Sequence, residues 1–443
     1  MNEWISGLPI ITEADVLVVG SGSAGVPAAI AAARSGASVV LVEKMGFLGG
    51  TSTAVLDTFY GFYTPGDTPR RVVAGIGSEV VDELRKLGPV LERPNTFGAG
   101  TGITYHPEHL KVAWENMALT AGVTVLLHTV LQAVRIENGR ILDVAVATKA
   151  GLQRISTRVV VDATGDADVC FHAGLKFETA GHIFPAQTLT TTFRMGNVDV
   201  TRRKTITKET LHDLMKSAAA TGRYEMPRHE GSDHVTPVDG VMATIMTRLP
   251  STKMRDGKQV NATDPIFLSA AEIEGRKQAL EYVRFLKDMV PGYEHADLVW
   301  MGTQIGVRET RRIQGLARLT KEDVLSARQF EDQIALCGAP IEDHHEGTDT
   351  RWHYIPNGGV VGIPYRTLVP EGAQNIVVAG RCFSATHDGH ASVRSMAQCM
   401  AMGEAAGTAA AMSSRQDCSV ADIDTDELRH TLRSQGAIVE ELT

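Results

Sequence analysis

The strongest pattern of apolar and polar positions lies near the N-terminal end of the chain. Residues 15–19 (DVLVV) form a short apolar, β-branched run, which is typical of a buried parallel strand. GSGSAG follows at 20–25 and leads into an alanine-rich segment that reaches Ser35, with Gly36 placed to end a helix. A second apolar run, 38–42, closes at Glu43. We therefore predict a strand–turn–helix–strand unit.

The three glycines of this turn each have a physical task in binding a dinucleotide. Gly20 makes the tight turn, Gly22 lets backbone N–H groups approach a pyrophosphate, and Gly25 lets the helix lie close to the strand. The helix N-terminus offers further unpaired N–H donors to the phosphates. Glu43, at the end of the second strand, can accept hydrogen bonds from both ribose hydroxyls. The unit predicts a dinucleotide site, for either NAD or FAD.

The alternation of helical and strand patterns continues after an aromatic-rich stretch at 54–104. We predict a helix at 71–87, a helix at 107–121 and a strand at 123–127. Three β segments at 131–137, 141–147 and 152–157 then form a small meander, which crosses over to a strand at 158–162. That strand ends in the small-residue turn DATGDAD, at an edge where open α/β sheets place their ligands.

A second region, residues 181–296, interrupts the first. Here we expect strands at 189–195 and 242–249, helices at 206–221 and 269–289, and a polar loop at 228–239. The first domain should resume with a return strand at 297–307, a strand at 375–381 and a long helix from about Ala391 to Met412. The predicted division is therefore 1–180, 181–296 and 297–443, with the middle region covering the opening of the ligand site.

Composition narrows the class of protein. The 443 residues carry a formal net charge of −9, which argues against nucleic-acid or anionic-membrane binding driven by bulk charge. Five widely spaced cysteines without a C-x-x-C suggest neither a disulfide framework nor a metal centre. We find no signal-peptide pattern and no apolar run of membrane-spanning length. We therefore expect a cytoplasmic protein without a membrane or nucleic-acid partner.

Three separated motifs carry a resemblance to a known family. GSGSAG with Glu43, VVVDATGDADV at 159–169, and NIVVAGR at 375–381 with the final alanine-rich helix coincide in one chain. Together they resemble the two-dinucleotide-binding-domain flavoproteins, specifically bacterial FAD-dependent oxidoreductases related to the fumarate reductase/succinate dehydrogenase flavoprotein group. The resemblance implies an α/β fold: a Rossmann-like FAD-binding domain with a β-meander crossover and an inserted α+β substrate domain.

The resemblance also implies which residues surround FAD. The glycine loop would hold the pyrophosphate, Glu43 the adenosine ribose, the Val130 backbone the adenine, and Gly50-Thr51 the ribityl and flavin. Gly380-Arg381 and the N-terminus of the last long helix would approach the flavin edge, where a helix dipole stabilises negative charge. The full predicted set is Gly20, Gly22, Ser23, Ala24, Gly25, Glu43, Lys44, Gly50, Thr51, Val130, Ala163, Thr164, Gly165, Gly380, Arg381, Ser392 and Val393.

Two departures from related flavoproteins are informative. Fumarate reductase flavoproteins often attach FAD through a histidine shortly after the glycine pair, and residues 49–56 contain none. We therefore expect noncovalent FAD. A second G-x-G-x-x-G with its own acid is also missing, so a dedicated nicotinamide domain is not expected.

Three residues are candidates for the chemistry, and each has a structural alternative. Arg308 could clamp a carboxylate, and the resemblance to the fumarate reductase group implies an arginine as proton donor. Arg308, Arg311 and Arg312 could equally form structural ion pairs. His387 could transfer protons near neutral pH, or it could be a structural histidine with satisfied hydrogen bonds. Arg394 could serve like Arg308, but its place in a buried helix favours a structural ion pair. Tyr365 could donate a proton, or it could be a core tyrosine tied by its hydroxyl. A metal site at His344-His345 is disfavoured, because adjacent residues rarely face one ion. We expect this pair in a solvated loop and predict no metal.

These observations lead to a hypothesis about the reaction. We expect hydride transfer between flavin N5 and a small oxygenated or carboxylated substrate, catalysed by a dehydrogenase or an enoate-type reductase with an unknown electron acceptor or donor. A flavin monooxygenase using NAD(P)H and oxygen is the alternative. A noncatalytic or RNA-modifying flavoprotein is a further one, although the acidic chain lacks long basic tracts. The sequence leaves the oligomeric state open, a homo-oligomer included.

Overall fold

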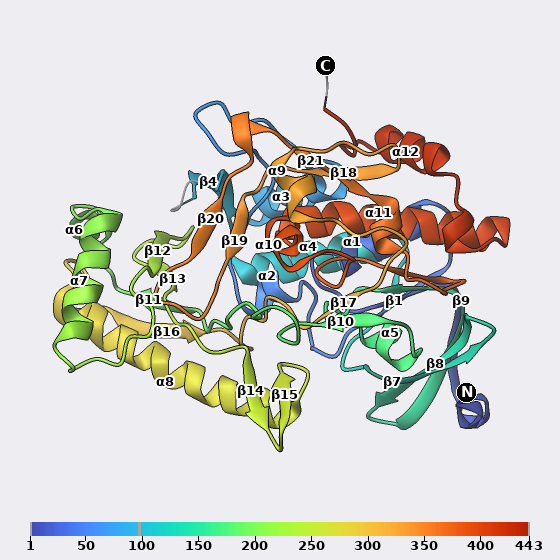
Figure 1. Cartoon of the computed structure of the whole chain (residues 1–443), viewed down its shortest axis with the longest axis horizontal. Coiled ribbons are helices and arrows are strands. Elements are labelled where there is room, and N and C mark those ends of the chain that lie inside the picture. Colours follow the sequence, from blue (N-terminus) through green and yellow to red (C-terminus); the bar gives the residue numbers. More distant parts are fainter. Residues whose placement is uncertain (1, 96–98, 442–443) are drawn as a thin grey trace.

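The molecule is built around a mixed β-sheet, seen at the right of the computed structural model in Figure 1. The structure describes residues 2–95 and 99–441. The strand order is β6-β2-β1-β9-β8-β7, and β22 also pairs with β9. Strands β6, β2, β1, β9 and β22 run parallel, whereas β9, β8 and β7 form an antiparallel meander. Their bounds are β1 (Ile10–Val19), β2 (Val39–Val42), β6 (Thr124–Leu126), β7 (Val130–Glu137), β8 (Arg140–Thr148), β9 (Gly151–Asp162) and β22 (Ile376–Val378).

This sheet confirms the predicted α/β class, with one difference in the meander. The segments expected at 152–157 and 158–162 are one continuous strand, β9. Its first half pairs with β8, and its last residues pair with β22. Because one strand serves both the meander and the parallel sheet, the turn after Asp162 lies at the same edge as the turn after Val19.

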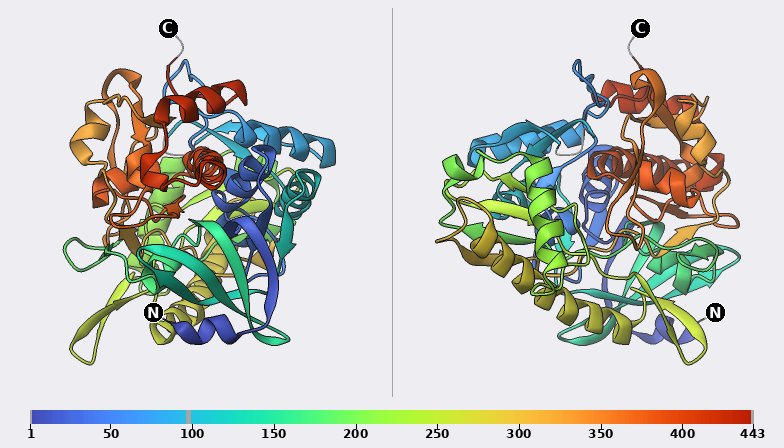
Figure 2. Two further views of the ribbon diagram at one scale, coloured as in Figure 1. Left: turned by 90° about the vertical axis from the view of Figure 1, so that its right-hand side faces the viewer. Right: turned by 60° about the vertical axis from the view of Figure 1, so that its left-hand side comes forward.

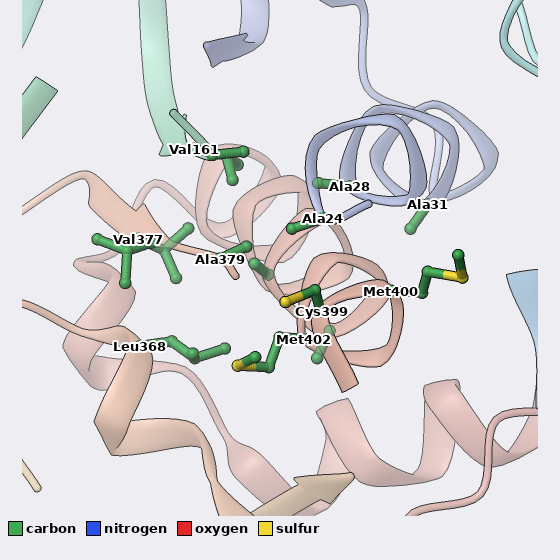
Figure 3. Packing of buried hydrophobic residues seen from close by; sticks show 14 of the residues in the cluster. Ala24, Ala28, Ala31, Val161, Leu368, Val377, Ala379, Cys399, Met400 and Met402 are labelled. Carbon is green, nitrogen blue, oxygen red and sulfur yellow. The ribbon is translucent and has the colours of Figure 1, made fainter. Parts of the chain in front are cut away.

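Helices α1 (Gly25–Arg34) and α11 (Met396–Gln416) pack together at backbone distance. A Cβ on Gly403 would lie 2.1 Å from the Ala24 carbonyl oxygen, and one on Gly407 would lie 2.0 Å from that of Ala28. Figure 3 shows Ala24 and Ala28 facing α11 within the buried core. The alanines and glycines of the two helices therefore allow their backbones to approach each other closely. Two further helices, α3 (Ile76–Leu87) and α4 (Pro107–Thr120), complete this layer.

The predicted long C-terminal helix is broken. α10 (His387–Val393) ends before Arg394, and α11 begins at Met396 after Ser395, whose backbone is extended (φ −59°, ψ 151°). Serine in an extended conformation is a common helix N-cap residue, so the sequence contains a reason for the break. The helix N-terminus near the C-terminal motif is therefore that of α11, five residues later than expected.

The inserted region has its own antiparallel sheet and core. The sheet order is β12-β13-β11-β16, and the core includes Phe193, Tyr282 and Phe285. Figure 1 shows this region on the left, with α8 along its outer edge, and the right-hand view in Figure 2 shows α8 on the same outer side. The elements are β11 (Phe193–Gly196), α6 (Val200–Arg203), α7 (Lys208–Ala220), β12 (Ser232–Val235), β13 (Met242–Ile245), β14 (Thr252–Arg255), β15 (Lys258–Asn261), α8 (Pro265–Met289) and β16 (Asp297–Met301).

Two predictions for this region need correction. The segment 228–239, expected as a loop, contains β12, which pairs with β13; Val235 packs on the region's core, whereas Ser232 lines the cavity and His234 contacts Asp57 at 2.9 Å. The expected return strand at 297–307 is β16, which pairs with β11 of the inserted sheet. This pairing favours a second boundary after β16 rather than at residue 296.

The remaining elements surround the sheet and the inserted region. They are α2 (Thr51–Ala54), β3 (Thr58–Phe59), β4 (Leu91–Pro94), β5 (Thr101–Thr104), α5 (Asp168–His172), β10 (Phe177–Thr179), β17 (Arg311–Ile313), α9 (Lys321–Leu325), β18 (Gln333–Cys337), β19 (Ile341–Asp343), β20 (Arg351–His353), β21 (Val361–Pro364) and α12 (Thr425–Ser434). Short 3-10 turns occupy Glu3–Gly7, Pro356–Gly358, Tyr365–Leu368 and Val420–Asp422. All five cysteines are free. No helix within the described ranges is long and apolar enough to cross a bilayer.

The close helix contact can be tested with Gly407→Ala. The added methyl group would overlap the Ala28 carbonyl oxygen, so we expect destabilisation by about 1–3 kcal/mol. Thermal melting followed by circular dichroism measures this. Gly7→Ala is the control, because a Cβ there meets no atom within 4 Å. Equal melting temperatures for the two variants would contradict the packing argument.

Candidate active site

A cavity of about 370 Å³ extends from the end of β2 to the inserted region. Glu43 and Val130 line one end, and Arg308 and His344 line the other. The glycine loop between β1 and α1 lies along the middle, opposite the turn after β9. The cavity is thus bounded by the carboxyl ends of the parallel strands, as is general for open α/β sheets.

Glu43 is buried at the first end and organises the glycine loop. Its Oε2 accepts hydrogen bonds from the Ser21 backbone N–H (2.9 Å) and the Ser21 hydroxyl (2.6 Å). Its Oε1 accepts one from the Met45 N–H at 2.8 Å. Lys44 and Val130 lie beside it in the cavity wall. The carboxylate therefore connects the end of β2 to the loop that would hold phosphates.

The glycines of the loop fit a dinucleotide. Gly20 has φ +92°, and a Cβ there would lie 2.6 Å from the Ala163 carbonyl oxygen. A Cβ on Gly25 would lie 1.8 Å from the Gly20 oxygen, so both glycines serve the fold itself. Gly22 differs, because a Cβ there would meet no protein atom within 4 Å. The open space over Gly22 faces the cavity, where a pyrophosphate needs close backbone approach.

The opposite wall comes from distant parts of the chain. The turn after β9 carries Asp166, whose carboxylate pairs with Arg381 at 2.6 Å. Burial raises the pKa of Asp166, but Arg381 and other partners lower it by more. A Cβ on Gly380 would lie 3.0 Å from the Ala24 side chain, so this segment lies directly against the start of α1.

Most of the predicted cofactor residues line this cavity. They are Gly20, Gly22, Ser23, Ala24, Glu43, Lys44, Gly50, Thr51, Val130, Ala163, Thr164, Gly165, Gly380 and Arg381. Gly25 lies behind the loop, in helix α1. Ser392 and Val393 do not line the cavity, because the helix break places them in α10, where the Ser392 hydroxyl donates to the Ala339 carbonyl at 2.7 Å. Ser395 and Met396, at the start of α11, line the cavity instead.

Three arginines line the end of the cavity next to the inserted region. Arg308 donates to the Thr188 carbonyl (2.7 Å) and the Thr190 hydroxyl (2.8 Å), and Arg394 donates to Gln187 Oε1 (2.7 Å). Among the described residues, none of Arg228, Arg308 and Arg394 forms an ion pair with a carboxylate. Nε of Arg228 and Nε of Arg394 are buried without any hydrogen-bond partner. Burial, followed by repulsion from Arg394, lowers the pKa of Arg308 well below its ordinary value.

One acidic side chain, Glu342, faces these arginines. Its side chain is 35% exposed to the cavity, and its Oε1 lies 2.8 Å from Nε2 of His344. Burial raises the pKa of Glu342, but His344, Arg394 and Arg308 together lower it to about 2. Burial and the charge of Arg308 lower the pKa of His344 well below its ordinary value. Among the described residues, Glu342 is the acid that lines this end of the cavity beside the three arginines. Glu230 and Glu309 also act on Arg228 and Arg394, but they lie outside the cavity lining, so guanidinium groups outnumber carboxylates in the wall itself.

The structure separates the predicted catalytic residues. Arg308 lines the cavity, as expected. Tyr365 does not, because its buried hydroxyl donates to the Val420 carbonyl at 2.8 Å, and burial raises its pKa. His387 also lies outside the cavity lining, between Glu309 and Asp343. Arg311 and Arg312, which follow Arg308 in the chain, form structural ion pairs.

Sequence reasoning missed Arg228, Glu342 and His344, and it favoured a structural role for Arg394. The histidine pair 344–345 was expected in a solvated loop, but Glu342 and His344 lie on one hairpin with alternate residues facing the cavity. Glu342 and His344 are two residues apart at a strand end, which places both side chains on one face, and this spacing was the available signal. In the described part of the chain, no group of three or more His, Cys, Asp or Glu side chains could hold a metal ion.

The fold and the cavity define a dinucleotide-binding protein whose cofactor is enclosed by distant parts of the chain. A family model described as FAD dependent oxidoreductase matches residues 15–432, and the chain belongs to this family. The resemblance drawn from the sequence motifs is thereby confirmed, as are FAD as the cofactor and an oxidoreductase as the class of enzyme.

Individual relatives are more distant. 4-Oxocyclohex-2-ene-1-carboxylate 5-dehydrogenase of Sinomonas cyclohexanicum is 41% identical over 96 residues, which are 22% of this chain and only 15% of that protein. A geranylgeranyl bacteriochlorophyll reductase-like protein from Thermoplasma acidophilum has a similar structure (TM-score 0.48, 12% identity, 96% of this chain and 84% of that chain). So does p-nitrophenol 4-monooxygenase PnpA from Pseudomonas putida (TM-score 0.48, 10% identity, 93% and 83%). Similarity at this level does not identify a reaction.

The open space over Gly22 yields a test of the cofactor site. Gly22→Ala should leave the fold intact, because its Cβ meets no protein atom, yet weaken FAD binding at least about tenfold by occupying the phosphate space. Gly25→Ala should destabilise the apoprotein itself. The melting temperature of the apoprotein reports the effect on the fold. The amount of flavin released by acid precipitation, per polypeptide, reports the effect on cofactor binding. Unchanged flavin content and affinity in Gly22→Ala would contradict this placement of the pyrophosphate.

Proposed function

We propose that this protein transfers hydride between a noncovalently bound FAD and a small organic carboxylate. The proposal rests on the three arginines at the end of the cavity next to the inserted region. Among the described residues, none of these guanidinium groups forms an ion pair with a carboxylate. Bound flavin supplies the hydride acceptor or donor. The residues of this chain would hold the substrate and move the accompanying proton.

Arg308 and Arg394 are suited to bind the substrate carboxylate. Both are held by neutral oxygens of the segment 187–190 rather than by acids, so their charge is available to a ligand. A guanidinium group binds a carboxylate through two parallel hydrogen bonds, which fixes orientation as well as affinity. Leaving several buried cations unpaired is costly, and an anionic ligand relieves that cost.

Glu342 is suited to exchange the proton. It faces the cavity beside the arginines, and its Oε1 lies 2.8 Å from Nε2 of His344. In the free protein, His344, Arg394 and Arg308 hold its pKa down at about 2. A substrate carboxylate that neutralises the two arginines would raise this pKa and make Glu342 a better base. Substrate binding and proton transfer would thus be coupled through charge.

The partial match to 4-oxocyclohex-2-ene-1-carboxylate 5-dehydrogenase supports the same class of substrate. That relative is named for a cyclic oxo-carboxylate and for a dehydrogenation. The match covers only 15% of that protein. We therefore take from it only the class of reaction and the carboxylate, and not the particular substrate. We therefore favour a dehydrogenase or enoate-type reductase over a monooxygenase.

Anaerobic flavin reduction tests the proposed reaction. We expect a cyclic oxo-carboxylate, from a panel differing in ring oxidation, to bleach the flavin without NAD(P)H. The matched controls are the methyl esters of the same compounds, which should react poorly because they carry no charge for the arginines. Equal reduction by acids and esters would overturn the carboxylate site. NAD(P)H oxidation coupled to oxygen and a hydroxylated product would instead establish the monooxygenase.

Arg308→Ala tests the carboxylate contact itself. A hydrogen bond to a charged group contributes about 1.5–3 kcal/mol. Its loss should therefore lower kcat/KM for the carboxylate about 10- to 100-fold. The same variant should have little effect on the methyl ester, which never made the contact. Arg415→Ala, at an exposed arginine of α11, is the control for general effects of arginine removal. An equal loss for acid and ester would remove Arg308 from substrate recognition.

A further inference from the structure

We propose that His387 is a positioning residue, which acts on the arginines and on Glu342 from outside the cavity. Its imidazole lies between two carboxylates, and each carboxylate is connected to a different part of the cavity wall. This inference rests on the proposed carboxylate site. It explains why a histidine favoured for catalysis by its sequence position lies outside the cavity lining.

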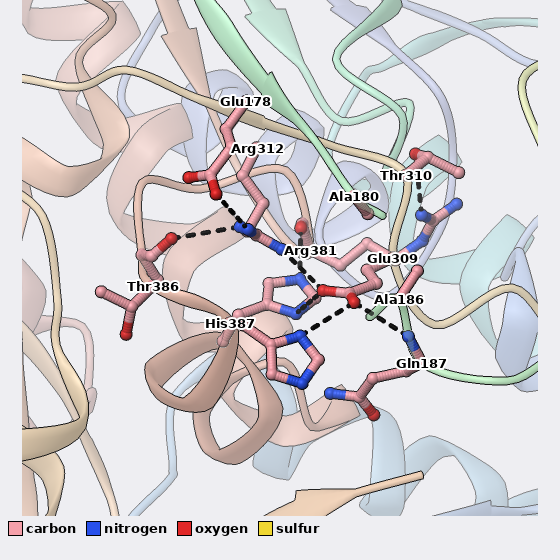
Figure 4. Close-up of polar contacts among 12 residues, drawn as sticks. Glu178, Ala180, Ala186, Gln187, Glu309, Thr310, Arg312, Arg381, Thr386 and His387 are labelled. Atoms are coloured by element: carbon pink, nitrogen blue, oxygen red, sulfur yellow. Dashed lines mark hydrogen bonds and ion pairs between the residues drawn. The ribbon is translucent and has the colours of Figure 1, made fainter. Parts of the chain in front are cut away.

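His387 begins helix α10, and both of its ring nitrogens face acids. Nδ1 lies 3.0 Å from Glu309 Oε1, and Nε2 lies 3.4 Å from Asp343 Oδ1. Only the doubly protonated imidazolium ring has an N–H for each of them. Figure 4 shows His387 directed at Glu309, which in turn contacts the backbone of Gln187.

The first connection leads to both arginines. Glu309 Oε1 also accepts a hydrogen bond from the Gln187 backbone N–H at 2.9 Å. The Gln187 side chain accepts one from Arg394 at 2.7 Å. The segment that starts at Gln187 continues to Thr188 and Thr190, whose oxygens hold Arg308. Fixing Glu309 therefore fixes the segment that orients Arg308 and Arg394.

The second connection leads to Glu342. Asp343 follows Glu342 in strand β19, which packs against α10. Successive residues of a strand point to opposite sides, so Asp343 can contact His387 while Glu342 faces the cavity. A contact of His387 with Asp343 therefore holds the strand that presents Glu342.

The surrounding charges decide the protonation of His387. The other oxygen of Glu309 pairs with Arg312 at 2.6 Å and lies 3.6 Å from Nδ1 of His390, whose pKa burial lowers. On the remaining sides are the ring of Phe184, Asp388 paired with Lys321 of α9, and His345 and Arg351 acting on Asp343.

The net result is a protonated imidazole at neutral pH. Burial lowers the pKa of His387, but hydrogen bonds to Asp343 and Glu309 raise it to about 9. Because this pKa is raised from the ordinary 6.5, the contribution of His387 is complete below that value and is lost as pH rises through about 9. A positioning role therefore predicts weaker binding of a carboxylate in alkaline solution.

The experiment compares His387→Gln with the wild-type holoenzyme. The probe is cyclohexanecarboxylate, and its dissociation constant is measured from the change in the bound flavin spectrum across a pH series. We expect about tenfold weaker binding in His387→Gln at neutral pH, from loss of one charged contact. In the wild-type protein, binding should weaken as pH rises through about 9, whereas the variant should lack this transition.

Two controls separate the possible outcomes. His353→Gln changes an exposed histidine of β20, next to β19, and should bind the probe like the wild type. Arg308→Ala tests the carboxylate site alone. Weak binding in Arg308→Ala with unchanged binding in His387→Gln would overturn the positioning role and leave the proposed function standing. Unchanged binding in both would overturn the proposed function.

A variant that loses its flavin still leaves the proposal testable. Flavin content and melting temperature of His387→Gln are measured first. If either falls sharply, the pH series of the wild-type holoenzyme decides. A probe affinity that stays constant as pH rises through about 9 would overturn the role of His387, since its two contacts depend on the imidazolium charge.

Discussion

The direct backbone contact between α1 and α11 is the constraint on which the cofactor site depends. At Gly403 and Gly407, α11 approaches the backbone of α1 with no side chain of its own in between. The start of α11 and the glycine loop before α1 therefore line the same cavity. Gly380, packed against Ala24, adds a further contact between the two halves of the FAD-binding fold. The N-terminal loop therefore has its functional shape only in the presence of the C-terminal helix.

A second constraint is electrostatic and concerns the other end of the cavity. Guanidinium groups inside a protein are ordinarily paired with carboxylates. Here Arg308 and Arg394 are oriented by carbonyl, hydroxyl and amide oxygens, while the nearby acid Glu309 is used by Arg312 and His387. Neutral partners hold the arginines in place without neutralising them. This arrangement suits the reversible binding of an anion better than it suits stability.

The parts of the site that could be predicted are those encoded by adjacent residues. The glycine spacing at 20–25 and the acid at 43 describe one strand–turn–helix–strand unit, so their geometry follows from local chemistry. The turn after β9 and the segment at Gly380 were found because each follows a recognisable strand. The break at Ser395 was missed because residues 391–396 contain neither glycine nor proline to mark it, and it appears only in the extended backbone of the serine.

The substrate end could not be predicted, because its residues meet only through the tertiary fold. Arg228 precedes a strand that was expected as loop, and Glu342 belongs to a hairpin more than a hundred residues later. Their proximity depends on how the inserted sheet lies over the FAD-binding fold, which no local spacing records. His387 shows the opposite case: it lies between Glu309 and Asp343, outside the cavity lining, and these acids around it could not be read from the sequence.

The sheet β12-β13-β11-β16 has a consequence for how this protein can diverge. It has its own core, separate from that of α1 and α11, yet residues on and beside it form the wall at the substrate end. Substitutions there leave the packing of the glycine loop at 20–25 and of α1 against α11 untouched. A designed library confined to this sheet can therefore vary one wall of the cavity while the opposite wall stays as it is.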